Sequence, residues 1–560
     1  MITYYNIFAT ITYLIIVLFF ILKKPVFLQS SFENPFSSRT EKILFFLFTG
    51  LGIFLRFYAL ASLPEGFHQD EASNSYEAFA IANYGIDRNG YPYPVYPITF
   101  GSGGGSPVLI YIYAFICKFF PPSVLSYRSI FAVCGCFTLI LFYFFLKKIH
   151  GNKVAILGLA FLAVMPWHVV LSRWGLDSNT IPFWIMLILM TFLQANFTQK
   201  TVLYIITSIL CAFILYCYGS ATFVMPFFVL LACSYSIWCK RLSWRQLYLS
   251  GIAFLITALP LAIFYFINVF DFPAIVTPYF SFAKFTGNHT NSVFISFDRT
   301  LPKQLTENLV HLLKILTIGT KDELWNYVPG YFTLFHFTFP ITFLGIFVAG
   351  KDFFSDMKKK VYNSHNLMFF LLISSTIIAL LMKQNINRII FIFLPLIYFM
   401  IFGLLSIGRY SQYLLRTAVI IFSVAGLFFI KDYFTEYGNM SNYLFMKGYG
   451  DAITYAESIR EDDQKIYSTY ENLASPFLTA LLYSRTSPYD YIDTVTYKGE
   501  DDEFKVASSF TYYTFGFPED IENEKYKDHI LIISNMEIPR FKSLGYQMEE
   551  FGNYQVLWYE

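Results

Sequence analysis

The sequence predicts a mainly α-helical membrane bundle of about twelve transmembrane helices, followed by a small α/β domain. Of the 560 residues, 56% are hydrophobic and only 14% are charged, whereas a typical soluble protein is about 25% charged. Many apolar stretches reach the length of roughly 18 residues that crosses a hydrocarbon core of about 30 Å. The segment 431–560 breaks this pattern, because it is polar and acidic residues outnumber basic ones there.

Hydrophobic windows of about 19 residues place the individual spans. These windows are 4–22, 43–61, 127–146, 153–171, 180–195, 201–218, 222–239, 247–267, 329–349, 366–382, 389–404 and 413–430. The first span lacks a basic region before it and a small-residue cleavage site after it, so we expect a retained helix and not a signal peptide.

Positive charge sets the orientation of these spans. Basic residues gather in alternate loops, for example at Lys147, Lys148 and Lys358–Lys360, and such loops face the cytoplasm. The short stretch Val108–Phe120 would break the alternation if it crossed the membrane. We therefore expect it outside, as a juxtamembrane or re-entrant helix, with both chain termini also outside.

Two domains follow from this topology. Residues 1–430 form the membrane domain, with exterior loops 62–126 and 268–328, and residues 431–560 form an exterior domain. The exterior domain combines a helical pattern at 452–460 with strand-like runs at 465–470, 529–534 and 554–559, which together indicate an α/β fold. All seven cysteines lie in or beside apolar segments, so the exterior domain has no disulfide framework.

The first polar cluster follows the second span and contains His68, Asp70 and Glu71. A carboxylate there can act as a general base toward a hydroxyl, and Glu71 can instead orient an acceptor or bind a divalent cation. The alternative is that both carboxylates cap a helix beginning near Ala72. A long loop, 84–107, comes next, and its glycine run 101–105 suits either a close approach to a ligand or a hinge.

Two further clusters occupy other exterior turns. His168, Arg173 and Asp177 lie between the fourth and fifth spans; arginine is an apt phosphate ligand, and Asp177 either pairs with it or adds a second carboxylate. His168 can instead belong to an interfacial aromatic belt. Asn387 and Arg388 lie between the tenth and eleventh spans, where the arginine suits either an anionic headgroup or generic lipid phosphates.

A smaller polar group at another exterior turn contains Tyr216 and Tyr218. Their rings suit stacking on a sugar, although interfacial tyrosines are common. Three clusters from distant parts of the chain thus converge on one membrane face. Acids that activate a nucleophile and arginines that hold a leaving phosphate are the groups needed for glycosyl transfer from a lipid-phosphate sugar.

On these residues the sequence resembles the GT-C glycosyltransferases, in the branch of protein mannosyltransferases and aminoarabinose transferases. The resemblance rests on His68-Gln-Asp-Glu71, on 166–177 and on Asn387-Arg388, and it covers about 43–404. It implies a polyprenyl-phosphate sugar donor, Asp70 as the base of an inverting reaction, and Arg173 and Arg388 as donor phosphate ligands. Some members bind a metal, so a divalent ion is a possible cofactor here, and no other cofactor is expected.

The acceptor predicted by this resemblance is a lipid, a glycan or a protein, and the transferred sugar is a hexose or a pentose. A bacterial plasma membrane is the expected location, and no nucleic acid is expected as a partner. Three other functions remain open: a transporter or flippase of a lipid-linked saccharide, a membrane anchor for the exterior domain, and a ligase or polymerase that uses a lipid diphosphate. Transporters commonly carry paired charges near the midplane or broken helices in related halves, and neither pattern is clear here.

Overall fold

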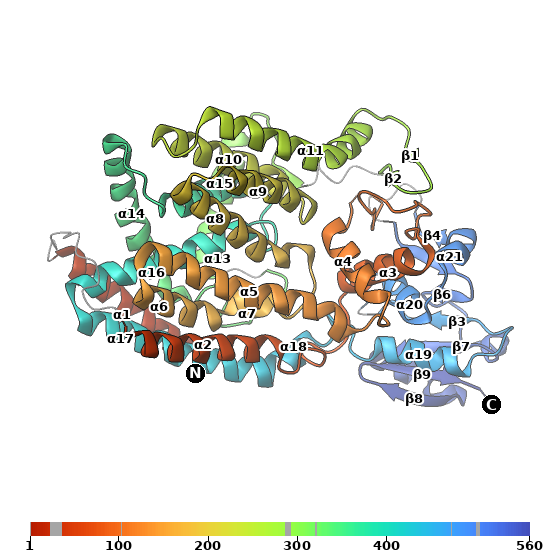
Figure 1. Ribbon diagram of the computed structural model, residues 1–560. Coiled ribbons are helices and arrows are strands. Elements are labelled where there is room, and N and C mark those ends of the chain that lie inside the picture. Colours follow the sequence, from red (N-terminus) through yellow and green to blue (C-terminus); the bar gives the residue numbers. More distant parts are fainter. Residues whose placement is uncertain are drawn as a thin grey trace.

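The computed structural model describes residues 2–22, 36–101, 103–285, 293–319, 322–471, 473–499 and 505–559. Lys23 and Lys24, as well as parts of the two predicted exterior loops, therefore lie outside the described residues. The chain forms a long helical bundle with a small mixed sheet domain at one end (Figure 1). This arrangement confirms the predicted fold class.

Every predicted span contains a helix, although the ninth, 329–349, becomes helical only from His336. The bundle helices are α1 (Ile2–Leu22), α2 (Ser38–Phe57), α5 (Val124–His150), α6 (Asn152–Ala163), α7 (Pro166–Leu171), α8 (Ile181–Thr198), α9 (Thr201–Phe213), α10 (Ala221–Trp238), α11 (Trp244–Val269), α14 (Phe339–Lys359), α15 (Asn366–Leu381), α16 (Phe393–Tyr410) and α17 (Gln412–Asp432). Within the described residues, eight helices are long and apolar enough to cross a membrane. The chain is thus a multi-pass membrane protein.

The other four predicted spans differ for identifiable reasons. The span 153–171 is divided into α6 and α7 just before Pro166, because the ring of a proline cannot continue the preceding helix. The spans 201–218 and 366–382 are shorter helices, α9 with a following 3₁₀ turn and α15. Helix α2 carries charged residues at both ends, including Glu41 and Arg56. At the centre of the bundle, every residue of α16 from Phe393 to Gly408 is buried.

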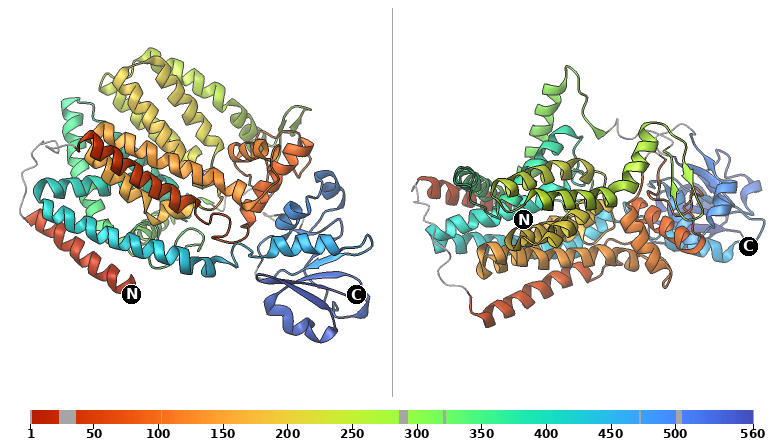
Figure 2. Two further views of the ribbon diagram at one scale, coloured as in Figure 1. Left: turned by 60° about the horizontal axis from the view of Figure 1, so that its bottom comes forward. Right: turned by 45° about the horizontal axis from the view of Figure 1, so that its top comes forward.

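The two predicted exterior loops contain further elements. The first holds α3 (Gln69–Tyr84) and α4 (Pro107–Cys117), and the second holds α13 (Leu301–Thr317) and a hairpin of β1 (Ile275–Val276) and β2 (Ser281–Phe282). The amide of Val95 donates to the carbonyl of Ser281, so the two loops meet beside the hairpin. Helices α3 and α4 lie between the bundle and the C-terminal domain (Figures 1 and 2).

The C-terminal domain is built on a seven-stranded mixed sheet with the strand order β4-β5-β6-β3-β7-β9-β8. Strand β3 is parallel to both β6 and β7, and the remaining pairs are antiparallel. The elements are β3 (Ile466–Ser468), β4 (Thr496–Tyr497), β5 (Ala507–Phe510), β6 (Tyr513–Phe515), β7 (Ile530–Ser534), β8 (Gln547–Phe551), β9 (Tyr554–Trp558), α19 (Tyr449–Ile459), α20 (Pro476–Ser484), α21 (Pro488–Thr494) and α22 (Ile538–Phe541). The predicted helix and three predicted strands correspond to α19, β3, β7 and β9.

A single hydrophobic cluster joins this domain to the exterior helices. It includes Tyr76 of α3 and Ile110 of α4 together with Leu478 of α20 and Ile532 of β7. The Tyr76 hydroxyl donates to the carbonyl of Thr486 at 2.8 Å. The sheet domain therefore packs directly on the helix that begins at the first polar cluster.

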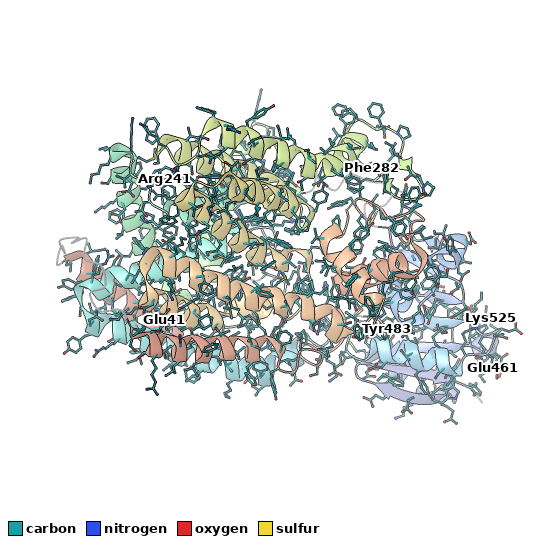
Figure 3. All side chains as sticks on the ribbon, in the orientation of Figure 1. Glu41, Arg241, Phe282, Glu461, Tyr483 and Lys525 are labelled. Atoms are coloured by element: carbon teal, nitrogen blue, oxygen red, sulfur yellow. The ribbon has the colours of Figure 1, made fainter. Side chains whose placement is uncertain are left out.

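The basic loops lie at the opposite end of the bundle. Arg241 and Glu41 lie far from the C-terminal domain, whereas Phe282 and Tyr483 lie beside or within it (Figure 3). At the sheet end, Asn6 of α1 donates to the carbonyl of Gly330, which places the start of the chain beside the segment that precedes α14. These positions agree with the alternation of loops that positive charge predicts.

Candidate functional site

Helix α3 positions the first polar cluster. His68 is its N-cap: the amide of Asp70 donates to His68 Nδ1 at 3.3 Å, and Glu71 accepts from the amide of His68 at 2.9 Å. Carboxylates are favoured in the first turn because the helix dipole is positive there. The helix begins at Gln69, and the capping alternative is correct for Glu71.

Glu71 is fully buried and saturated with hydrogen-bond donors. Its Oε1 accepts from Arg128 Nε at 2.8 Å and from the amide of Gly175 at 2.7 Å, while its Oε2 accepts from Arg128 Nη2 at 2.7 Å as well as from His68. Arg128 also donates to the carbonyls of Pro64 and Gly66. Glu71 thus anchors α3 to the loops around it and has no oxygen free for a base or a metal ligand.

Asp70, one residue earlier, is in a different position. Its side chain is 27% exposed, and its carboxylate lies 3.4 Å from His68 Nδ1. The His68 ring packs against Trp325 and Trp174, with centroids 4.6 and 5.4 Å away. His68 therefore orients Asp70 from an aromatic setting, and Asp70 is the accessible carboxylate of the pair.

Asp177 does not pair with Arg173. Of the two alternatives for Asp177, the geometry therefore supports a second carboxylate at the site. Its Oδ1 accepts from Asn74 Nδ2 and its Oδ2 from the amide of Ser106, both at 2.8 Å. Asp177 lies within electrostatic range of Asp70. The 101–105 run contributes to this arrangement through Gly105, where a Cβ would lie 2.3 Å from Asn74 Oδ1.

The position of Arg173 argues against its predicted role as a phosphate ligand. The side chain is fully buried and donates to the carbonyls of Leu55, Ala59 and Leu63 and to the hydroxyl of Tyr433. A guanidinium carries five N–H donors, and these partners accept from four of them. Arg173 fastens the end of α2 to the segment that follows α17 and does not face the site.

His168 and Tyr216 are also structural. His168 is fully buried on α7 and its Nδ1 contacts Arg56 Nη2. The Tyr216 hydroxyl donates to the carbonyl of Thr257 at 2.8 Å and accepts from the amide of Leu261 at 3.1 Å. The hydroxyl thus inserts between these two backbone groups of α11, next to Pro260. Such an insertion is a common cause of a helix bend. Both side chains are engaged within the fold, which argues against a role as substrate ligands.

Tyr218 and Arg388 do lie with the acids. Arg388, Asp177 and Asp70 are all within electrostatic range of the Tyr218 hydroxyl. The Arg388 side chain is partly exposed and donates one hydrogen bond, from Nη1 to the carbonyl of Lys383 at 3.0 Å, which leaves other N–H groups of the fork for a ligand. Asn387 beside it is only 7% exposed, so its position favours packing over contact with a substrate.

The segment around α13 forms hydrogen bonds with the loop that carries Arg388. Asp322 Oδ2 accepts from the backbone amide of Ile386 at 2.8 Å, and Gln384 Nε2 donates to the carbonyl of Asn308 at 2.9 Å. Arg388 is therefore set in place by the second exterior loop, whereas Asp70 and Asp177 are set by the first.

Sequence reasoning missed several residues of this site. Arg128 opens the third predicted span, and an ionisable residue inside a span was the available signal. Asn74 and Ser106 gave no signal, because their partners lie far away in the chain. Among the described residues, no group of three or more His, Cys, Asp or Glu side chains is arranged to hold a metal ion, and we derive no step through one.

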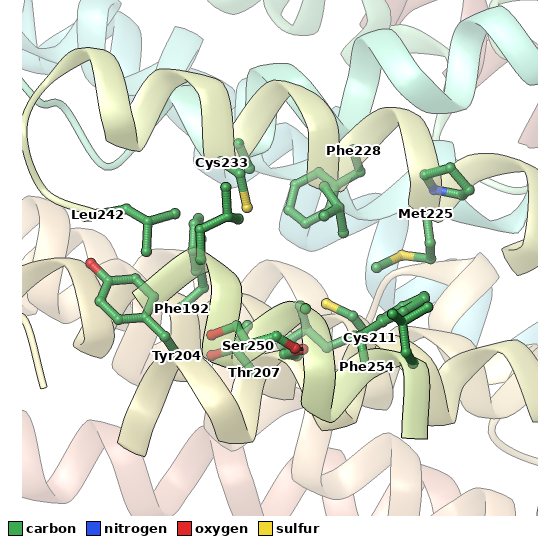
Figure 4. Close-up of a pocket in the computed structure, with 18 of the residues that line it drawn as sticks. Phe192, Tyr204, Thr207, Cys211, Met225, Phe228, Cys233, Leu242, Ser250 and Phe254 are labelled. Carbon is green, nitrogen blue, oxygen red and sulfur yellow. Dashed lines mark hydrogen bonds between the residues drawn. The ribbon is translucent and has the colours of Figure 1, made fainter. Parts of the chain in front are cut away.

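An apolar cavity of about 430 Å³ lies between α8, α9, α10 and α11 and extends from Leu242, beside Arg241 at the basic end, to Leu215 (Figure 4). Leu215, Cys211, Met225 and Phe254 line it. Leu215 directly precedes Tyr216 in the turn that leads to Tyr218, so one part of the cavity lies close to the polar site.

Comparison with known proteins supports the resemblance. Residues 104–264 match the family model described as dolichyl-phosphate-mannose-protein mannosyltransferase. The predicted likeness to protein mannosyltransferases is therefore confirmed for this part of the chain, which runs from the glycine run to α11. No curated protein sequence matches the chain.

Solved structures give weaker likenesses. ArnT from Cupriavidus metallidurans bound to undecaprenyl phosphate is 13% identical with a TM-score of 0.47, over 93% of this chain and 98% of ArnT. The oligosaccharyltransferase AglB from Archaeoglobus fulgidus, in complex with an inhibitory peptide and a dolichol-phosphate, is 12% identical with a TM-score of 0.46. That match covers 79% of this chain and 64% of AglB, so the chain spans less than two thirds of that protein. Likenesses at this level carry no functional argument.

Proposed function

We propose that this protein is an integral membrane glycosyltransferase that moves a sugar from a polyprenyl-phosphate donor to an acceptor on the face that carries the C-terminal domain. The observation that supports this most is the contrast between Asp70 and Glu71. Glu71 is closed off by Arg128, whereas Asp70 is accessible and lies with Asp177, Tyr218 and Arg388 at the end of the bundle.

In the proposed reaction Asp70 takes the proton of the acceptor hydroxyl. The hydroxyl oxygen forms a bond to the anomeric carbon on the face opposite the leaving group, and the bond from that carbon to the phosphate oxygen breaks. The configuration therefore inverts. Arg388 compensates the charge of the departing lipid phosphate, and Asp177, held by Asn74 and Ser106, is the second carboxylate of the site.

The apolar cavity next to the turn offers a place for part of a polyprenyl chain, because its walls are almost entirely hydrophobic and it adjoins Leu215. The acceptor is a lipid, a glycan or a protein. The charge alternation favours an exterior site, and the absence of cysteines from 431–560 fits a bacterial plasma membrane.

The experiment that tests this proposal compares wild type with Asp70→Asn in membranes supplied with radiolabelled polyprenyl-phosphate sugars. We expect the substitution to lower transfer by about 10²–10⁴-fold, the usual contribution of a general base. An undiminished rate in the variant would remove Asp70 from the mechanism. A wild-type protein that transfers no lipid-linked sugar but moves one across the bilayer would instead be a flippase.

A further inference from the structure

A second apolar groove lies between α2, α6 and α17, toward the end of the bundle that carries the basic loops. Its volume is about 930 Å³. Apolar side chains from all three helices form its walls, among them Leu44, Phe48, Leu157, Phe161, Val419 and Phe422. The polar side chains that line it include Lys153 and Arg416.

The two cations lie at the same end of this groove. Helices α6 and α17 run side by side in the same direction, because the rings of Phe161 and Phe422 stack with centroids 3.7 Å apart and Val164 packs against Gly426. Lys153 precedes Phe161 and Arg416 precedes Phe422. At 1.5 Å per residue these offsets are about 12 and 9 Å back along the two helices.

Neither cation has a carboxylate partner in the part of the chain that the structure describes. Among the described residues, no carboxylate forms an ion pair with Lys153 or Arg416, and the Lys153 ammonium lies 5.6 Å from the centre of the Phe36 ring. The nearby carboxylate of Glu41 already pairs with Lys147 and accepts from Asn152. The described residues thus leave the mouth of the groove positive, which suits an anionic ligand.

The groove is long enough for an acyl chain. Its lining extends about 16 Å along α6, from Lys153 to Val164, and about 27 Å along α17, from Gln412 to Ile430. A ligand with an anionic head at the cations and an apolar tail along the groove has the chemistry of a membrane phospholipid. Basic pockets between transmembrane helices on the cytoplasmic side bind anionic headgroups.

We propose that this groove binds one anionic glycerophospholipid of the leaflet at the basic end, with its phosphate between Lys153 and Arg416 and an acyl chain along α6 and α17. The site lies at the other end of the bundle from Asp70, because α2 runs from Glu41 at the basic end toward the loop that leads to α3. It is therefore separate from the donor site and does not depend on the proposed sugar transfer.

The test uses the full chain in nanodiscs that contain phosphatidylglycerol and phosphatidylcholine, with retained lipids identified by native mass spectrometry. We expect wild type to retain phosphatidylglycerol selectively. Each cation near a membrane surface contributes about five-fold to such binding, so Lys153→Gln with Arg416→Gln should weaken retention by about thirty-fold. The matched control is Lys200→Gln with Arg245→Gln, which removes two cations of the same end that do not line the groove.

A second variant, Ala160→Trp, fills the groove without changing its charge and should also expel the lipid. The elution of each variant in size-exclusion chromatography reports whether it folds. Equal retention of phosphatidylglycerol by the groove variants and the control would overturn the proposal. Equal retention of both phospholipids by wild type, or a bound polyprenyl phosphate that the same substitutions displace, would overturn it as well.

Discussion

Replacing Glu71 by glutamine should destabilise the protein strongly, although the change is nearly isosteric. Each oxygen of Glu71 accepts two hydrogen bonds, one of them from Arg128. A glutamine must turn its NH₂ group toward two of these donors, and it also leaves the buried Arg128 without a counter-charge. Removing one partner of a buried ion pair costs about 3–5 kcal/mol.

The assay is equilibrium unfolding of purified protein in mixed micelles across a denaturant series. The control is Glu307→Gln, the same chemical change at an exposed residue whose carboxylate lies 3.9 Å from Lys303. An exposed pair contributes only about 0–1 kcal/mol. A free energy of unfolding for Glu71→Gln within about 1 kcal/mol of the control would refute the anchoring role and restore Glu71 as a candidate for the chemistry.

Three other perturbations probe the site and its surroundings. Arg388→Gln should raise the KM for the lipid-phosphate donor about ten-fold, the effect of losing roughly 1.4 kcal/mol of phosphate binding; an unchanged KM would contradict the phosphate role. Burial and the adjacent Glu77 raise the pKa of Asp87, so the folded state holds that proton more tightly than the unfolded state. The free energy of unfolding should therefore fall as pH rises from the pKa of Asp87 in the unfolded state to its pKa in the folded state. Asp87→Asn should flatten this dependence, which is measured as melting temperature against pH. Gly251→Trp fills the apolar cavity and should slow transfer. The control, Gly50→Trp, also has open space at its Cβ and should not slow it. Equal transfer rates for the two variants would show that the cavity does not hold the donor.

The helices were predictable because they depend on local composition. Hydrophobic length can be read within each segment, and each of the twelve predicted spans contains a helix for that reason. The break at Pro166 shows the limit, since one residue divides a span whose hydropathy is continuous. In the C-terminal domain, strand-like runs predicted β3, β7 and β9, but not their parallel and antiparallel order, which tertiary packing decides.

The side-chain partners were far less predictable. Arg173 and Arg388 look alike in the sequence, since both are arginines at exterior turns. The structure separates them because three carbonyls of the α2 end enclose Arg173, and no local pattern encodes that enclosure. Asp70 and Glu71 are neighbours, yet a helical turn directs one toward the site and the other toward Arg128.

The hydrophobic cluster shared by the exterior helices and the sheet domain has a consequence for biosynthesis. The chain emerges from the ribosome N-terminus first, so α3 and α4 are made long before α20 and β9 exist. Their apolar faces, including Tyr76, meet these partners only after more than 350 further residues have been added. The helix that carries Asp70 is therefore completed by a part of the chain that is synthesised much later, and a chain truncated before β9 would lack part of that support.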